Sequence, residues 1–157
     1  MADKKPGKDA TQNICRNRRA SFEYLILESL ECGIVLTGTE VKSLREHTAN
    51  LEDAYAKIED GEVWLIGSDI PEYSMGNRLN HKPKRPRKLL LHRSEIAKWA
   101  AKATERGLTL VPIRMYFKEG RAKVEIAVAQ GKKTHDKRES MKKADAVRDI
   151  KRAMGRK

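Results

Sequence analysis

The net charge of this chain is concentrated at its two ends. Its 157 residues include 34 Lys or Arg and 22 Asp or Glu, a net charge of +12. Residues 131–157 contribute +7 and residues 1–19 contribute +4, whereas residues 20–130 hold 17 basic and 16 acidic side chains. Residues 20–130, in which basic and acidic side chains nearly cancel, are therefore expected to fold compactly. The basic ends are suited to binding a polyanion. The alternative is that basic ends only keep a small protein soluble.

This pattern divides the chain into three parts. Residues 1–15 are polar and carry Pro6 and Gly7, which predicts a disordered basic N-terminal arm. Residues 16–130 are long enough for one small domain with a hydrophobic core. Residues 131–157 form a separate basic tail.

Short hydrophobic segments separated by turn residues dominate the middle part. They predict six strands, at 22–28, 34–36, 54–58, 63–66, 108–117 and 122–129. The turns expected within successive strand pairs contain Cys32-Gly33, Asp60-Gly61 and 118–121. Two helices are expected, at 38–45 and 94–106. Because hairpins recur without a strand–helix–strand repeat, the predicted fold is mainly β, a small antiparallel barrel with helices at its rim.

Two basic segments favour nucleic acid as the partner. The long loop 71–87 leads into the segment 82–88, which contains two prolines and no acidic residue, so its charge is not neutralised locally. In the tail, a thin apolar stripe is too small to hold a helix in water unaided, so we expect it to fold on contact with RNA. The stripe consists of Met141, Ala144, Val147, Ile150 and Met154. The alternatives are a solvated linker for the loop and a helix docked on the barrel for the tail.

Other functional classes lack support in the sequence. The four histidines have no spacing that would place them together as metal ligands, and no nucleophile motif or phosphate-binding glycine loop is present. We therefore expect no catalytic residue, metal or cofactor. Cys15 and Cys32 are expected to be free thiols in a reducing cytoplasm. No apolar run is long enough to span a bilayer, so no membrane partner is expected.

Several motifs together resemble the SsrA-binding protein family (small protein B) of bacterial trans-translation. The most specific is the run at 38–45, Gly-Thr-Glu-Val-Lys-Ser-Leu-Arg, and the similarity covers about residues 13–150. Further matching segments lie at 17–20, 33–37, 49–51, 61–65, 87–92, 107–112, 116–117, 131–133 and 136–138. The resemblance implies an oligonucleotide-binding-type barrel that binds the tRNA-like domain of transfer-messenger RNA (SsrA RNA) and delivers it, as a monomer, to stalled ribosomes.

The resemblance also implies two sets of contact residues. Candidates for contact with transfer-messenger RNA are Glu31, Leu90 and Lys123, together with Asn17, Arg18 and Arg19. Candidates for contact with the ribosomal decoding centre are Gly131, Lys132, Lys133, His135, Asp136, Lys137 and Arg138, followed by a helix in the mRNA channel. The competing interpretations are a ribosomal or general structured-RNA-binding protein or chaperone, and an enzyme such as a ribonuclease.

Overall fold

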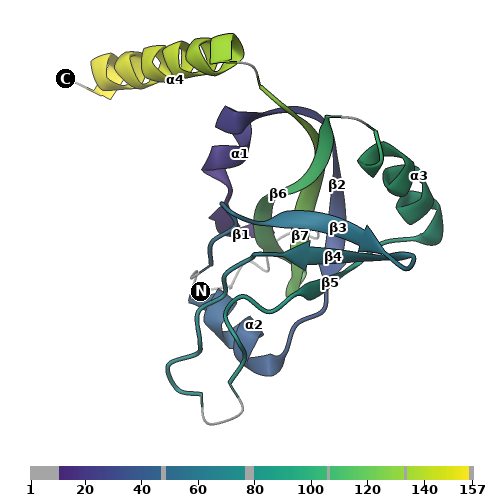
Figure 1. Cartoon of the computed structure of the whole chain (residues 1–157). Coiled ribbons are helices and arrows are strands. Elements are labelled where there is room, and N and C mark those ends of the chain that lie inside the picture. Colours follow the sequence, from purple (N-terminus) through teal and green to yellow (C-terminus); the bar gives the residue numbers. More distant parts are fainter. Residues whose placement is uncertain (1–10, 47–48, 77–79, 106, 133, 156–157) are drawn as a thin grey trace.

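The computed structural model describes residues 11–46, 49–76, 80–105, 107–132 and 134–155, and its centre is a closed antiparallel sheet (Figure 1). The strands are β1 (Thr11–Arg16), β2 (Tyr24–Ile34), β3 (Tyr55–Glu59), β4 (Glu62–Ile66), β5 (Arg87–Leu90), β6 (Leu108–Lys118) and β7 (Arg121–Gly131). Six of them form a ring in the order β6-β3-β4-β5-β2-β7, which β7 closes by pairing with β6. The predicted antiparallel barrel is therefore confirmed.

Two hairpins and two helices lie close to their predicted positions. The β3–β4 turn uses positive φ angles at both Asp60 (51°) and Gly61 (73°), as a tight two-residue hairpin turn requires. The β6–β7 hairpin also follows its predicted span. The helices are α1 (Arg18–Glu23), α2 (Gly38–Arg45), α3 (Arg93–Ala103) and α4 (Thr134–Gly155). Of these, α2 and α3 were predicted as elements of the domain, and α1 was not.

Three expectations need correction. Residues 11–15 do not belong to a disordered arm, because β1 pairs with β6 from Thr11 to Arg16; residues 1–10 lie outside the described part. Cys32-Gly33 is not a turn, because β2 runs straight through it. The predicted strand at 34–36 does not fold back on the strand before it. Instead, β2 pairs with β7 over most of its length and with β5 at its end.

The core lies inside the ring and beneath two helices. The inward side chains of β6 and β7, including Met115, Val124 and Ile126, are fully buried. Trp99 of α3 and Leu44 of α2 join the same hydrophobic cluster. A second, smaller cluster lies under α1, where Ala20 packs on Val111 and Ala129. Helices at the rim thus cover parts of the barrel and leave the outer face of β2 and β5 open.

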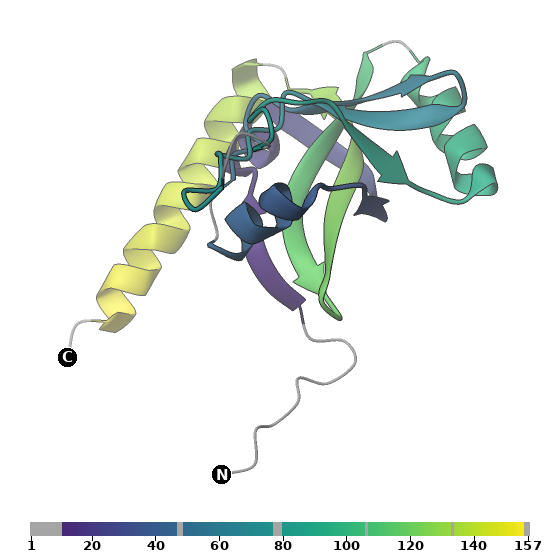
Figure 2. The ribbon, with the colours of Figure 1, turned by 90° about the horizontal axis from the view of Figure 1, so that it is seen from below.

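The basic tail forms a long helix that projects from the barrel (Figures 1 and 2). Disorder was expected for the tail without RNA, whereas the structure has a continuous helix from Thr134 to Gly155. No proline interrupts this span and its only glycine is the last residue, so local propensity favours the helix. Its apolar stripe is nevertheless exposed at Met141, Val147, Ile150 and Met154.

Candidate nucleic-acid interface

Strand register brings two of the predicted RNA contacts into one row on the outer face of the barrel. Gly33 on β2 pairs with Leu90 on β5 on one side and with Lys123 on β7 on the other. The neighbouring residues Cys32 and Val124 are buried in the core. Because side chains alternate between the two faces of a strand, this row points outward. Leu90 is 52% exposed.

Gly33, at the centre of this row, has no side chain, and its absence makes room for Leu90. A Cβ on Gly33 would lie 3.2 Å from the Cβ of Leu90, closer than ordinary contact. Glycine therefore lets the side chain of Leu90 lie against the neighbouring strand, in the same row as Lys123.

Glu31 stands two residues before Gly33, on the same face of β2. The hydroxyl of Tyr116 donates a short hydrogen bond to Oε2 of Glu31, and Nζ of Lys118 lies 3.5 Å from the same oxygen. The hydrogen bond from Tyr116, followed by the charge of Lys118, lowers the pKa of Glu31 below its ordinary value. Burial and the hydrogen bond to Glu31 raise the pKa of Tyr116. At neutral pH the pair is thus a carboxylate held by a neutral phenol.

Sequence reasoning assigned no role to Tyr116, although Tyr116 lies in one of the matching motifs. Its partner is 85 residues away in the chain, and only the pairing of β6 with β7 and of β7 with β2 brings the two together. No local signal in the sequence could have identified this contact.

The second group of predicted contacts lies at the other end of β2, in and before α1. Asn17 is 4% exposed, and all its side-chain hydrogen bonds stay within the protein. Its Oδ1 accepts from Ala20 N–H (3.1 Å), and its Nδ2 donates to the carbonyls of Leu51 (3.1 Å) and Pro112 (2.9 Å). Asn17 therefore caps and anchors α1 and is covered from outside contact.

The arginines that follow Asn17 are exposed on α1. Arg19 pairs with Glu23 and Asp53, each at 3.1 Å. Arg18 faces the groove between α1 and α4, which Phe22 and Met141 also line. Because α1 precedes β2 and Gly33 lies near the end of that eleven-residue strand, the structure does not bring this group together with Glu31 and Leu90.

The base of the tail lies beside α1. Gly131 ends β7 opposite Tyr24, and the next residue, Lys132, donates its backbone N–H to the carbonyl of Glu23 (2.9 Å) and its Nζ to that of Ser21 (2.9 Å). Lys133 lies outside the described residues. His135, Asp136 and Lys137 are described through the backbone of α4 alone, and Arg138 is exposed.

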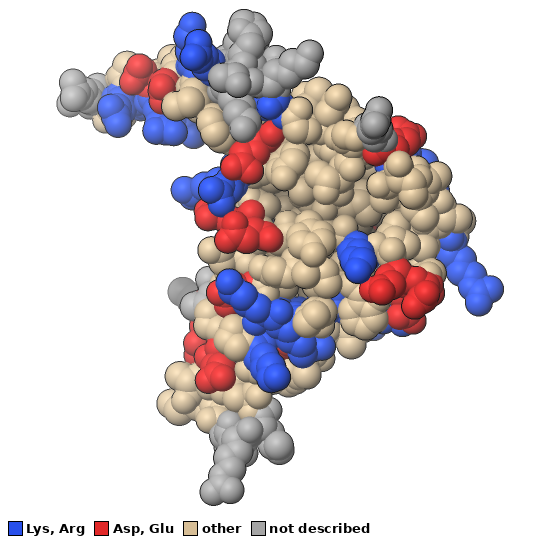
Figure 3. Space-filling model, in the orientation of Figure 1, with Lys and Arg blue, Asp and Glu red and all other residues tan. Residues whose placement is uncertain are grey.

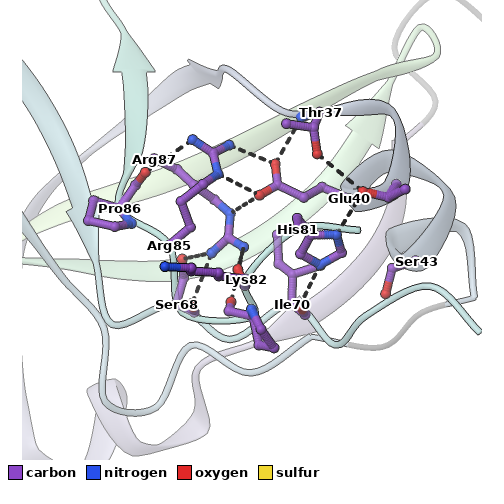
Figure 4. Close-up of polar contacts among 12 residues, drawn as sticks. Thr37, Glu40, Ser43, Ser68, Ile70, His81, Lys82, Arg85, Pro86 and Arg87 are labelled. Atoms are coloured by element: carbon purple, nitrogen blue, oxygen red, sulfur yellow. Dashed lines mark hydrogen bonds and ion pairs between the residues drawn. The ribbon is translucent and has the colours of Figure 1, made fainter. Parts of the chain in front are cut away.

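The charge of the basic segment 82–88 is largely neutralised by acidic side chains from other elements, contrary to the prediction (Figure 4). The fully buried carboxylate of Glu40 accepts hydrogen bonds from Arg85 (2.9 Å to each oxygen) and from Nε of Arg87 (3.0 Å). Lys88 pairs with Glu62 at 2.9 Å. The expectation of charge without local neutralisation is therefore wrong for these three side chains. The reason is that their acidic partners come from α2 and β4, distant in the sequence.

Other kinds of site find no support in the described part of the chain. It contains no group of three or more His, Cys, Asp or Glu residues placed to hold a metal ion. None of its helices is long and apolar enough to cross a membrane. Burial raises the pKa of Cys15 to about 11 and that of Cys32 to about 12, which favours the protonated thiol over the thiolate at neutral pH.

Comparison with known proteins identifies the family of this chain. The family model for SmpB protein matches residues 14–156. The chain belongs to the SmpB family. The SsrA-binding protein of Desulforudis audaxviator (strain MP104C) is 54% identical over 146 residues, which cover 93% of this chain and 95% of that protein. The SsrA-binding protein of Syntrophomonas wolfei subsp. wolfei is 57% identical over 138 residues, 88% of each chain.

A solved SmpB-family structure also resembles this chain. It is described as "tmRNA-SmpB: a journey to the center of the bacterial ribosome" and matches with a TM-score of 0.66 at 47% identity. The match covers 76% of this chain and 85% of that one. At this sequence identity the two chains share a family as well as a fold.

Proposed function

We propose that this chain binds the tRNA-like domain of transfer-messenger RNA and delivers that RNA to stalled ribosomes, acting as a monomeric, non-enzymatic adaptor in the cytoplasm. The observation that carries the proposal is the outward row of Leu90, Gly33 and Lys123 with Glu31 beside it. The relatives that share about half of this sequence are named for binding SsrA RNA, which supports the same partner here.

Within this surface, Glu31 acts as a hydrogen-bond acceptor. A carboxylate repels phosphates, but it can accept from a base amino group or a ribose 2′-hydroxyl group. Among the described residues, the contacts of Glu31 with Tyr116 and Lys118 both use Oε2, which leaves Oε1 for the RNA. Leu90 offers an apolar surface for a sugar or base, and Lys123 supplies a phosphate contact.

The tail serves the ribosomal step. Gly131 and Lys132 fix its base against α1, and His135, Asp136 and Lys137 lie in the first turns of α4. We assign the decoding centre as the partner of these five residues together with Lys133 and Arg138, and the mRNA channel as the place of the remaining helix. Arg18 lies beside this base and extends the same basic surface, Arg19 is paired with Glu23 and Asp53, and Asn17 holds α1 in position.

Removing the tail after Gln130 tests this division of labour. The shortened chain should bind a transcript of the tRNA-like domain within about threefold of the full chain, because the barrel surface is intact, yet fail to support peptide tagging on stalled ribosomes. A large loss of RNA affinity would contradict the division. His135→Ala in the full chain should reproduce the ribosomal defect alone.

Recovery of the bound RNA from a cell lysate tests the partner itself. One dominant small RNA with a tRNA-like end is expected. Comparable recovery of many structured RNAs, or stable association with idle ribosomes, would favour a general RNA-binding protein or chaperone instead.

A further inference from the structure

The turn at 82–86 is held more firmly than an exposed loop requires. It closes through the N–H of Arg85, which donates to the carbonyl of Lys82 (3.2 Å). The carbonyl of Pro83 accepts from the N–H of Ile70 (3.0 Å) and from the guanidinium of Arg87 (3.0 Å). Two prolines within the turn further restrict its backbone.

Side chains anchor the turn at both ends (Figure 4). Before it, the ring of His81 lies between Oγ1 of Thr39 (2.9 Å) and the carbonyl of Ile70 (2.8 Å). Nε2 must donate to that carbonyl, because a carbonyl oxygen can only accept, and Nδ1 shares the second hydrogen bond with the hydroxyl of Thr39. After it, Arg87 is fully buried and is fixed by Glu40.

A buried ion pair of this kind does not by itself explain stability, because desolvation offsets much of the attraction between the charges. The hydrogen bonds of Glu40 with Arg85 and Arg87 instead fix the position of the turn. They link α2 to the turn, and so fix the direction in which the remaining side chains of the turn point.

Those remaining side chains are two lysines. Lys82 and Lys84 are exposed, and within the described residues neither ammonium has a carboxylate at ion-pair distance. The other cations of the segment are paired, as described above. Figure 3 shows basic side chains gathered in the region of α2 and the start of β5.

We propose that Lys82 and Lys84 form a second RNA-binding surface, which contacts the phosphate backbone of the RNA whose tRNA-like domain binds at Leu90; the proposal rests on the proposed function. Leu90 ends the strand that Arg87 begins, so the strand end that follows the turn lies about 10 Å from Leu90 along β5. A rigid turn has little conformational entropy left to lose when its lysines bind, which favours affinity.

The test uses the full chain with Lys82→Ala and Lys84→Ala combined, and measures affinity for the SsrA tRNA-like transcript over a series of salt concentrations. Each lost phosphate contact lowers the slope of log affinity against log salt by about 0.7–0.9, so a decrease of about 1.5 is expected, with a loss of about tenfold in affinity at moderate salt. The matched control is Lys57→Ala with Lys98→Ala, two exposed lysines that already pair with Glu59 and Glu28.

The outcomes separate this inference from the proposed function. An unchanged slope and affinity in the Lys82/Lys84 variant, or an equal change in the control, would overturn the second surface. An unmodified chain that does not prefer the SsrA transcript to an unrelated stem-loop RNA would instead overturn the proposed function. The same salt series is run on the stem-loop RNA, so the change in slope decides the inference in either case. Both lysines are exposed, and unchanged thermal unfolding should verify that the variant folds.

Discussion

Glu40 and Glu31 are both ionised at neutral pH, but their surroundings are opposite. Glu40 is fully buried, and although burial opposes its ionisation, hydrogen bonds from Arg85 and the backbone of Thr37, with the charge of Arg87, hold its pKa below the ordinary value. Glu31 is partly exposed and uses one oxygen within the protein. The first carboxylate therefore serves the fold, and the second remains accessible to a ligand.

Replacing Glu40 with Gln should destabilise the protein strongly. The substitution keeps the size of the side chain but leaves the buried guanidinium of Arg87 without its counter-charge, which typically costs about 3–5 kcal/mol. Urea unfolding measures the free-energy difference. The control is Glu62→Gln, which breaks the surface pair with Lys88 and should cost less than about 1 kcal/mol. Similar costs for the two variants would argue against the network as an anchor.

Replacing Tyr116 with Phe should weaken RNA binding without unfolding the barrel. Loss of one hydrogen bond to a partly exposed carboxylate should reduce affinity for the tRNA-like transcript by about fivefold. Tyr55→Phe, on β3, is the control and should leave the affinity unchanged.

The same variant changes the titration of Glu31. In the native protein its lowered pKa keeps the carboxylate ionised until the pH falls below the ordinary value of 4.5. Without the phenol, the pKa should rise, so protonation begins at a higher pH as acid is added. Carboxyl chemical shifts measured by NMR would detect the change, and an unaltered titration would mean that Tyr116 does not position Glu31.

Hairpins and helices with short-range signals were predictable, whereas long-range pairings were not. The Asp60-Gly61 turn and the alternation around Val124 are local patterns, and both were interpreted correctly. The register of β2 depends on β5 and β7, which come much later in the chain, so Cys32-Gly33 was misread as a turn. The neutralisation of Arg87 by Glu40 was missed for the same reason. A net charge counted along a segment cannot include a partner from another strand or helix.

The candidate site was likewise predictable only in part. The resemblance supplied Glu31, Leu90 and Lys123, and the sheet register places these residues, which are far apart in the sequence, on one face of the barrel. It could not supply the burial of Asn17 or the support from Tyr116, because both depend on packing between strands.

Helix α4 should be far less protected than the barrel. It contacts the rest of the protein mainly at α1, and its apolar side chains are exposed at Val147, Ile150 and Met154. A helix of this length is marginal in water when little packing supports it. Amide hydrogen exchange should therefore be within about tenfold of the unstructured rate along α4 and slow in β6 and β7. Equal protection of α4 and β6 would show that the helix is docked on the barrel.

The distribution of charge predicts how the intact chain chooses between RNAs. The tail carries +7 of the net charge of +12 but lies outside the row around Gly33. It should therefore add more to binding of any RNA than to recognition of the right one. Truncation after Gln130 should reduce affinity for an unrelated duplex RNA more than affinity for the tRNA-like transcript, so the ratio of the two rises. A falling ratio, in competition binding at fixed salt, would place part of the recognition in the tail.

The pairing of β1 with β6 has a consequence for how the protein is made. Thr11–Arg16 leaves the ribosomal exit tunnel before the other strands, yet its partner, Arg114–Lys118, is among the last segments of the barrel to be synthesised. The ring itself closes only when β6 meets β7. Completion of the fold must therefore wait until nearly the entire domain has emerged, and during translation β1 and most of β2 remain unpaired and open to chaperones.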